Sequence, residues 1–586
     1  MVASKLQRLL IVPIVGLFAW ALAAGVRAES PLPVPLSLDQ GWSATTEQAF
    51  YYTPQGTVVM PVSWLRALDA PDGKPLMAPE RMRRLGFLLD GPAATGNPYH
   101  WPIGFAINSG PLAGPVPTAG LTCAACHTSE ITYKGRVMRV DGGQANIDLD
   151  GFKKIVSDAI LATGGDPGRK AAFEARAVEF GFPKDAIGPA FEARYQALKA
   201  SIPERMKYAA ASTRAGPGRN DALAAIALTV FNYDLGVPTN TNRATAPVDF
   251  PYLWDIARFD WVQYNGAVHQ PMARNIGEAL GVGAVTNFID ASGNLNPAPD
   301  RWRTSIPVGN LYAIETLIES LKPPRWPAAI LGAIDPAKAA RGKQLFGQNC
   351  AACHGVRALA GSASDEWSLK VIALDKIGTD PNQAENFRND TYDGTKLGLT
   401  KTTTAGEGLL AVTNAIRDQA YVDQGVPESQ RAKYDGYGRK NVLTMPCGYK
   451  ARPLVGVWAT PPFLHNGSVP SIFALLSEQR PATFRTGSVE YDPVHLGFVE
   501  ATGPSAMTVD TTLPGNSNAG HWFTDDRTRK GRIGRRFTDA EKYDLIEYLK
   551  ATTYADYPRT VVLHPDPQPC VAASQAYPAG NERTTK

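Results

Sequence analysis

Two five-residue stretches share one pattern of residues that can do chemistry. Cys123-Ala124-Ala125-Cys126-His127 and Cys350-Ala351-Ala352-Cys353-His354 each place a histidine directly after two thiols three positions apart. Thiols at this spacing can add to the two vinyl groups at one edge of a porphyrin, and the histidine can then reach the iron. We therefore predict two covalently bound haem c groups. The residues that would hold them are Cys123, Cys126, His127, Cys350, Cys353 and His354.

A zinc site is the alternative interpretation of paired Cys-x-x-Cys motifs, because four thiolates can form a tetrahedral cage. That interpretation gives neither histidine a role. It also has to join motifs 223 residues apart (350 minus 127). We therefore favour haem.

The sixth ligand of the second haem has to come from elsewhere in the chain. The chain has eight histidines, and two of them belong to the motifs. His521 ends the glycine-rich loop 515–521, and such loops can approach a porphyrin edge closely. We predict His521 as the ligand. Met445 and His465 are the alternatives, and His465 could instead be a structural histidine near a propionate or between domains.

The first haem is notable for a missing histidine. No histidine lies between residues 128 and 268, and the methionines in that segment are Met138 and Met206. A histidine ligand that follows the motif closely is therefore excluded, which leaves His269, a more remote group or an open face. An open iron can bind O2 or peroxide, whereas an iron with strong ligands on both faces carries electrons. We expect the haem on His127 to be the reactive centre and the other to be an electron relay.

Two helices are expected to frame the second haem. Asp335 and Pro336 begin a helix that leads through Gly342 into the second motif, and a capping box at Thr538 and Glu541 begins another. The pair resembles the first and last helices of small cytochromes c, which cross where a glycine allows close approach. We expect Gly342 to meet Tyr548 or Leu549.

The remaining elements are predicted from apolar periodicity and turn residues. We expect a strand near 57–64, a hairpin over 131–140 that turns at Lys134-Gly135, and an irregular tail after 556. Helices are expected over 148–163, 171–180, 191–202 and 222–232. The fold class is then mainly α with large irregular regions, built from two cytochrome c-like haem domains with insertions. The expected divisions are a signal peptide (1–28), an N-terminal extension (29–99), haem domains (100–324 and 335–555) and a C-terminal tail (556–586).

The N-terminus indicates export. Lys5 and Arg8 precede an apolar run that ends in a small-x-small sequence at Ala28, which is typical of a secretory signal. The run of 18 residues could alternatively remain as a membrane anchor. We expect cleavage and a periplasmic or secreted protein, which would contact a membrane only if the signal is retained.

Cysteine usage and charge agree with export. Cys447 and Cys570 lie outside the motifs, and a disulfide between them would pin the tail to the second haem domain; two buried free thiols are the alternative. The net charge of +4 falls to about +1 without the three cationic residues of the signal (4 minus 3), which argues against a nucleic-acid partner.

Taken together, these segments resemble the bacterial di-haem cytochrome c peroxidase superfamily, which includes MauG-type enzymes, and within it most closely the rubber oxygenase branch. The resemblance covers most of residues 100–555. It is carried by the two motifs, 141–143, 259–261, 270–272, 274–275, 450–454, 458–468 and 515–521. It implies that the N-terminal haem is catalytic, that the C-terminal haem passes electrons, and that Trp261 is the tryptophan between them. An ordinary core tryptophan is the alternative for Trp261.

The expected function follows from this resemblance. Peroxidases of the family use a histidine close after the first motif, and its absence here favours the oxygenase branch. We expect an enzyme that activates O2 at the first haem, with an apolar or polyisoprenoid substrate. Phe259, Ile276, Trp302 and 209–211 could line a channel for it, or belong to the core. The alternatives are a peroxidase that reduces H2O2 with electrons from a partner cytochrome, and a non-catalytic electron-transfer cytochrome. The basic run 530–536 could dock such a partner or be a solvated loop.

Overall fold

The computed structural model describes residues 34–90, 97–109, 112, 116–187, 189–362 and 365–570. The expected signal peptide and the last part of the tail lie outside these residues. From Val34 onward the chain forms one compact unit, so contacts cross the expected domain boundaries, which stay predictions.

The unit is a mixture of helix and strand, at 39% helical and 16% strand, so the expected mainly α fold holds only loosely. The helices are α1 (Ala44–Tyr52), α2 (Val62–Ala67), α3 (Pro79–Arg84), α4 (Cys123–Cys126), α5 (Leu149–Gly165), α6 (Pro167–Glu179), α7 (Pro189–Ala210), α8 (Ala222–Ala227), α9 (Pro271–Gly281), α10 (Val308–Glu319), α11 (Ala328–Leu331), α12 (Pro336–Asn349), α13 (Ala351–His354), α14 (Leu374–Ile377), α15 (Asn382–Asn389), α16 (Ala405–Asp423), α17 (Glu428–Tyr434), α18 (Ile472–Leu475) and α19 (Asp539–Ala551).

The strands are short, and the described sheets have two or three strands each. They are β1 (Leu36–Ser37), β2 (Met60–Pro61), β3 (Phe105–Asn108), β4 (Thr118–Leu121), β5 (Thr128–Tyr133), β6 (Arg136–Asp141), β7 (Arg219–Asn220), β8 (Val248–Asp249), β9 (Val356–Leu359), β10 (Val371–Ala373), β11 (Thr391–Tyr392), β12 (Thr403–Thr404), β13 (Gly448–Lys450), β14 (Thr483–Thr486), β15 (Tyr491–Asp492), β16 (Gly497–Phe498), β17 (Met507–Asp510), β18 (Trp522–Phe523), β19 (Arg532–Gly534) and β20 (Arg559–Val562).

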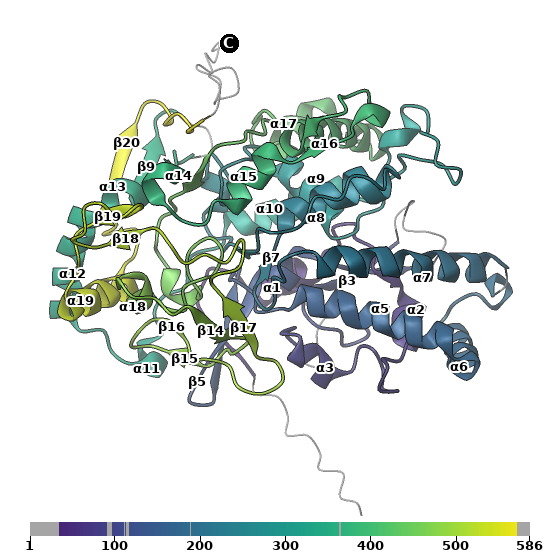
Figure 1. The fold of residues 1–586 in the computed structure, drawn as a ribbon, viewed down its shortest axis with the longest axis horizontal. Coiled ribbons are helices and arrows are strands. Elements are labelled where there is room, and N and C mark those ends of the chain that lie inside the picture. The colour runs from purple at the N-terminus through teal and green to yellow at the C-terminus, as the bar shows by residue number, and fades with distance from the viewer. Residues whose placement is uncertain are drawn as a thin grey trace, which may run out of the picture. The chain divides into compact units, whose positions relative to one another are not determined.

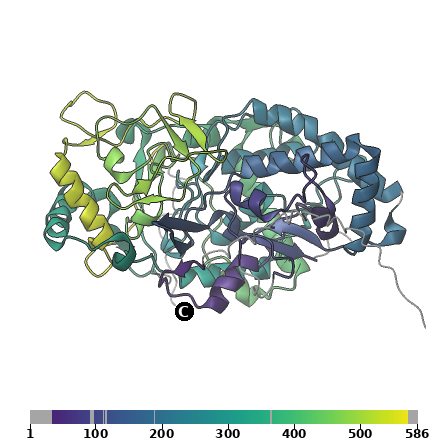
Figure 2. The same cartoon turned by 90° about the horizontal axis from the view of Figure 1, so that it is seen from below.

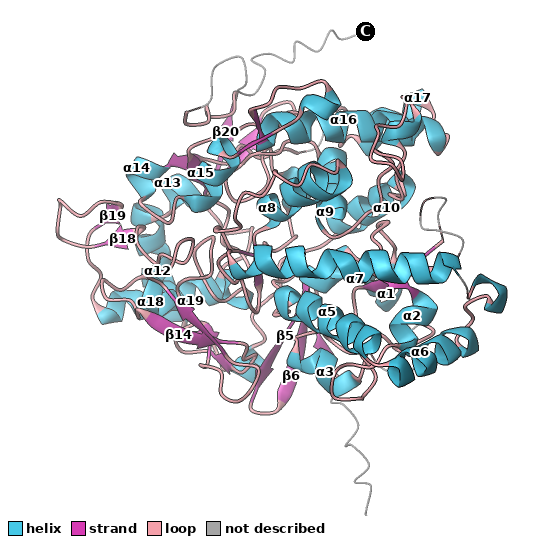
Figure 3. Ribbon diagram, turned by 45° about the vertical axis from the view of Figure 1, so that its right-hand side comes forward, coloured by secondary structure: helices cyan, strands magenta, loops and turns pink. Residues whose placement is uncertain are grey.

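The helices that follow the first motif are confirmed. Asp148 caps α5 by accepting a hydrogen bond from the Gly151 amide at 2.8 Å, as an N-cap carboxylate should. Helices α5, α6 and α7 lie together in Figure 1, while α12 and α19 lie at the other end of the unit, and Figure 2 shows the same separation. Between them α9 packs against α8, α10 and α16 (Figure 3).

The predicted hairpin is confirmed, because its turn residues specify where the two strands begin and end. The β5–β6 hairpin turns at Lys134 and Gly135, which both have positive φ. The strand expected near residues 57–64 is reduced to β2, because Pro61 caps α2 and Trp64 lies in that helix.

Helices α12 and α19 cross at a glycine, as predicted. A Cβ on Gly342 would lie 1.9 Å from the carbonyl oxygen of Asp544 and 2.8 Å from the Cβ of Tyr548. The predicted caps are present, since Asp335 accepts from the amides of Ala337 and Lys338, and Thr538 forms its capping box with Glu541. These two helices therefore fix the chain that leads into the second motif.

The described part of the tail, residues 557–570, is more regular than expected. Strand β20 pairs in parallel with β9, directly after the second motif. The predicted disulfide between Cys447 and Cys570 is confirmed. The Gln568 side chain also donates to the carbonyl of Gly266 at 2.7 Å, so the tail crosses onto the segment that contains Trp261.

Replacing Cys447 and Cys570 together with serine is expected to lower the free energy of unfolding by about 2–5 kcal/mol, because the bridge closes a loop of 123 residues and restricts the unfolded chain. Urea unfolding with and without reductant measures the effect. Reductant should destabilise the parent protein but not the double serine variant, which is the control. An unchanged urea midpoint in that variant would show that β20 and the hydrogen bonds of the tail suffice.

Candidate functional site

The second motif places its histidine opposite His521. His354 Nδ1 bonds with the Arg452 carbonyl at 2.7 Å, which leaves Nε2 as the nitrogen that could bind a metal. The ring centroids of His354 and His521 are 6.2 Å apart and the rings are inclined at 63°. An iron bound at about 2 Å by imidazole nitrogens on both sides would separate the centroids by roughly 6 Å. The gap therefore fits a haem iron.

Both imidazoles are neutral, as metal ligands must be. Burial lowers the pKa of both rings, that of His521 to about 3, and the charge of Arg480 acts on His521 in the same direction. The other candidate ligands are engaged elsewhere. His465 stacks on Tyr449 with ring centroids 3.9 Å apart, and the Met445 side chain packs beside Gly406.

The first motif forms α4, which the fold holds closely on both sides. Thr122 caps it by accepting from the Ala124 amide, and its hydroxyl donates to the Tyr51 carbonyl of α1. Gly104 has a φ of +89°, and a Cβ there would lie 2.3 Å from the Ala125 amide nitrogen. His127 is buried, which lowers its pKa to about 4, while the Pro251 backbone opposes that shift.

A small cavity of about 30 Å³ lies beside Cys123 and His127. Its apolar wall is formed by Pro251, Leu253, Ile256, Val262 and Ile318. Its polar wall is formed by Gln263, Arg274, Asn275, Glu278 and Glu315. The motif thiols, His127 and the apolar side chains are the donors and the surface that a covalently bound haem needs, and the polar side chains add groups that can act on a ligand there.

The polar wall contains two sets of hydrogen-bonded side chains. Gln263 Nε2 donates to Glu278 Oε1 at 2.9 Å. Arg274 and Asn275 both donate to Glu315. Burial raises the pKa of Glu278, while the charge of Arg274 and the Gln263 hydrogen bond oppose the rise. Burial therefore favours the protonated form of Glu278, and its two neighbours favour the carboxylate.

Sequence reasoning gave these side chains no role. Arg274 and Glu278 stand four residues apart on α9, so they share one face of a helix whose other residues are mostly apolar and buried. That pairing is the signal that could have identified them.

A structural repeat with an offset of 201 residues relates the two sites. Gln263 and Leu464 have φ angles of 64° and 65°, and each begins a turn that continues into Asn-Gly. The turns close with matching bridges, Val262 with Val268 and Phe463 with Val469. The Pro251 backbone faces His127 just as the Arg452 carbonyl accepts from His354.

The two copies of the repeat also contact each other through equivalent positions. Tyr252 donates to the Pro453 carbonyl, and Trp254 Nε1 donates to the Val455 carbonyl at 3.0 Å. The rings of Tyr264 and His465 meet at 6.2 Å. Each pair is separated by 201 residues, so the segments that support His127 and His354 contact each other in register.

Trp261 belongs to the first copy of this repeat and is 1% exposed. Its neighbours Val262 and Gln263 line the cavity, while Asp260 accepts a hydrogen bond from the Leu369 amide beyond the second motif. The ring of His269 lies 5.3 Å from the indole, and His269 Nδ1 bonds with the Asp260 carbonyl.

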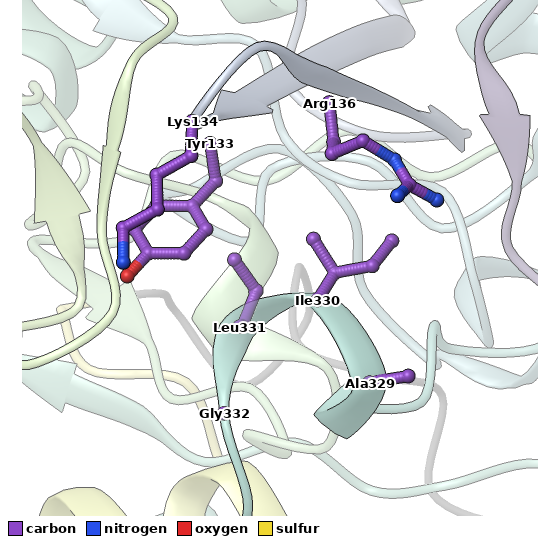
Figure 4. A pocket seen from close by; sticks show the side chains of 7 residues that line it. All are labelled: Tyr133, Lys134, Arg136, Ala329, Ile330, Leu331 and Gly332. Carbon is purple, nitrogen blue, oxygen red and sulfur yellow. The ribbon is translucent and has the colours of Figure 1, made fainter.

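A second hollow shares no lining residue with this cavity. Tyr133, Lys134 and Arg136 of the β5–β6 hairpin face Ile330 and Leu331 of α11 across it (Figure 4). Its lining includes neither a motif cysteine nor a histidine. Among the described residues, no three or more His, Cys, Asp or Glu side chains are grouped so that they could hold a metal ion.

None of the helices in the described ranges has the length and apolar character needed to span a membrane.

Comparison with known proteins defines the class. Residues 339–424 match the cytochrome c family model, and residues 448–485 match the model for RoxA-like, cytochrome c-like domains. The first range contains Cys350 to His354, and the second contains Arg452 and His465. The chain is a redox protein that binds haem c covalently, and its haem attachment and disulfide indicate a compartment outside the cytoplasm.

The chain belongs to the family of the Sinorhizobium fredii (strain NBRC 101917 / NGR234) protein whose name is printed as "Uncharacterized protein y4iJ". The two are 37% identical over 574 residues, which cover 88% of this chain and 92% of the relative. "Uncharacterized protein y4iM" of the same strain is 26% identical over 340 residues, covering 54% and 69% respectively.

Proposed function

We propose that the protein is an exported di-haem c oxidoreductase, periplasmic or secreted, that reduces a peroxide at the first haem with electrons relayed by the second. The polar wall beside His127 is the observation that carries this proposal. The count of two haems is supported by the repeat, because it provides each Cys-x-x-Cys-His motif with the same supporting segment.

The two haems are given different roles by their surroundings. The rings of His354 and His521 are separated by a gap that fits one iron. We therefore assign His521 as the sixth ligand of a closed, electron-carrying iron. The cavity at His127 contains carboxyl, amide and guanidinium groups instead of a second imidazole among its lining residues. Such groups bind and protonate oxygen species rather than saturate an iron.

The bound haem supplies an iron that can accept an oxygen ligand and store oxidising equivalents. Glu278 then handles the proton, since a carboxylate in the cavity can take it from one peroxide oxygen and return it to the departing oxygen. Gln263 orients Glu278 through its hydrogen bond. Arg274, held by Glu315, supplies positive charge where negative charge develops on the departing oxygen.

Oxygenase chemistry is the second candidate, and the RoxA-like match favours it. The matched segment, however, supports His354 rather than the cavity at His127. Of the residues expected to line an apolar channel, Phe259 and Ile276 are buried in the core, which was the alternative for them, and Ala209 and Ala210 are exposed on α7. The lining of the cavity at His127 is mixed, and its carboxyl, amide and guanidinium groups are the feature that favours peroxide as the substrate.

One experiment separates these functions. The purified holoprotein is given H2O2 with a reduced small c-type cytochrome, and separately polyisoprene under O2. We expect donor oxidation that depends on peroxide, and no cleavage of the polymer. Oligomeric keto-aldehydes from polyisoprene, without donor oxidation, would overturn the proposal in favour of the oxygenase. Inactivity in both assays would favour a pure electron-transfer cytochrome.

The pH dependence of turnover reports on Glu278. Because the proton acceptor is the carboxylate, activity is lost as pH falls through the raised pKa of Glu278. Replacing Gln263 with leucine, the residue at the equivalent position of the second repeat, removes a hydrogen bond that lowers this pKa. We expect the acid limb of kcat/KM to move up by about one pH unit, roughly the effect of one hydrogen bond to a charged group. A shift to lower pH would contradict the assignment.

We assign Trp261 to the path between the haems, because its neighbours line the first site and Asp260 bonds to the segment after the second motif. Trp261→Phe should slow electron passage from the second haem to the first in stopped-flow reduction. An unchanged rate of electron transfer would show that Trp261 does not lie on the path.

A further inference from the structure

His521 occupies a backbone conformation that needs outside support. Its φ is +51°, in the left-handed region that residues with a Cβ rarely adopt. Gly520 before it has a φ of +76° and packs so closely on Gly378 that a Cβ would lie 2.2 Å from the Gly378 carbonyl carbon. The His521 amide donates to the Ile377 carbonyl at 2.8 Å. The imidazole is therefore presented by a tightly wound loop rather than by a helix or strand.

One side chain gathers the carbonyl groups of this loop. Arg480 donates through one guanidinium nitrogen to Asn518 and to Gly520, the latter at 2.9 Å. Through the other nitrogen it donates to His521 at 3.2 Å and to Leu475 of α18 at 3.0 Å. A planar guanidinium can bind several acceptors at once in a fixed geometry. Arg480 thus ties the loop to α18.

The guanidinium is itself held in place by an aromatic ring. Arg480 lies 3.8 Å from the ring centroid of Trp522, and Arg529 lies 3.6 Å from the same centroid. Stacking of this kind is favourable for arginine. Arg529 contacts the Glu478 carbonyl, and no hydrogen bond to the carbonyls of residues 518–521 is recorded for it. The two arginines therefore share the ring but differ in whether they hold the loop.

We propose that Arg480 is a positioning residue that keeps the imidazole of His521 on the iron of the second haem. The inference rests on the proposed role of His521 as the sixth ligand. Without the guanidinium, three carbonyls next to a left-handed histidine lose their common donor. The loop can then relax and withdraw the imidazole, which leaves the second iron open.

The test compares four variants of the holoprotein by electron paramagnetic resonance and visible spectra of the oxidised state. Arg480→Gln is expected to shift the ratio of ligated to open second haem by about 100-fold toward the open, high-spin form, the change expected when charge-assisted hydrogen bonds are lost. Arg480→Lys keeps the charge without the planar fork and should fall between Arg480→Gln and the parent protein. Arg529→Gln is the matched control and should keep the low-spin signal. Added imidazole should restore that signal to Arg480→Gln.

The His521→Ala variant separates the assignment of His521 as a ligand from the positioning role of Arg480. If His521→Ala becomes high-spin while Arg480→Gln stays low-spin, the positioning role is wrong and the ligand assignment stands. If His521→Ala keeps the low-spin signal, the ligand assignment itself fails. Failure of imidazole to restore Arg480→Gln would mean that the substitution damaged the domain rather than released the ligand, and would also count against the positioning role.

Discussion

Replacing Glu278 with glutamine is expected to lower kcat/KM for peroxide reduction by about 10²–10⁴-fold, the usual contribution of a general acid–base group. Glutamine keeps the size and polarity of the side chain but cannot carry the proton between the two peroxide oxygens. The haem content and the low-spin signal of the second haem should not change, because Glu278 lines only the cavity beside His127. Steady-state oxidation of a reduced donor measures the effect.

Glu319→Gln is the matched control for Glu278→Gln. Glu319 lies on α10 four residues after Glu315, outside the residues that line the cavity. Burial also raises its pKa, as it does for Glu278. The two variants therefore differ in access to the cavity rather than in the kind of group removed. Equal activity in both would show that Glu278 has no part in the chemistry.

Gly342→Ala is expected to have the largest effect on stability. The added Cβ would overlap the backbone of α19, which cannot move aside like a flexible side chain. Helices α12 and α19 would have to separate, and that exposes buried side chains such as Phe346 and Leu545. We expect a loss of at least about 3 kcal/mol in the free energy of unfolding, measured by urea unfolding.

Gly347→Ala on the same helix provides the comparison. A Cβ at Gly347 meets no atom within 4 Å, so its replacement should stabilise the helix by about 0.5–1 kcal/mol. Similar unfolding midpoints for the two alanine variants would contradict the close crossing of α12 and α19.

Local patterns predicted much of the chain. The haem motifs, the caps of α12 and α19, and the turn of the β5–β6 hairpin each depend on a few neighbouring residues whose chemistry is specific. The disulfide followed from counting cysteines. The glycine-rich loop around His521 identified the imidazole that faces His354, because glycines in the sequence indicate an unusual backbone conformation.

The cavity and the repeat could not be predicted in the same way. Gln263 and Glu278 meet only after the chain folds back through α9, and neither belongs to a motif. The repeat preserves backbone conformation more than residue type, since Gln263 corresponds to Leu464 and Tyr264 to His465. Strand β20 was missed because its partner β9 lies some 200 residues earlier in the chain.

Electron paramagnetic resonance of the oxidised holoprotein tests the central claim most directly. We predict an open first haem beside the Glu278 cavity and a second haem closed by His354 and His521. The spectrum should then show one high-spin and one low-spin signal, each representing one iron per protein. His521→Ala should convert the low-spin signal alone. Two low-spin signals in the parent protein would contradict the account, because the first iron would then have no free face for peroxide.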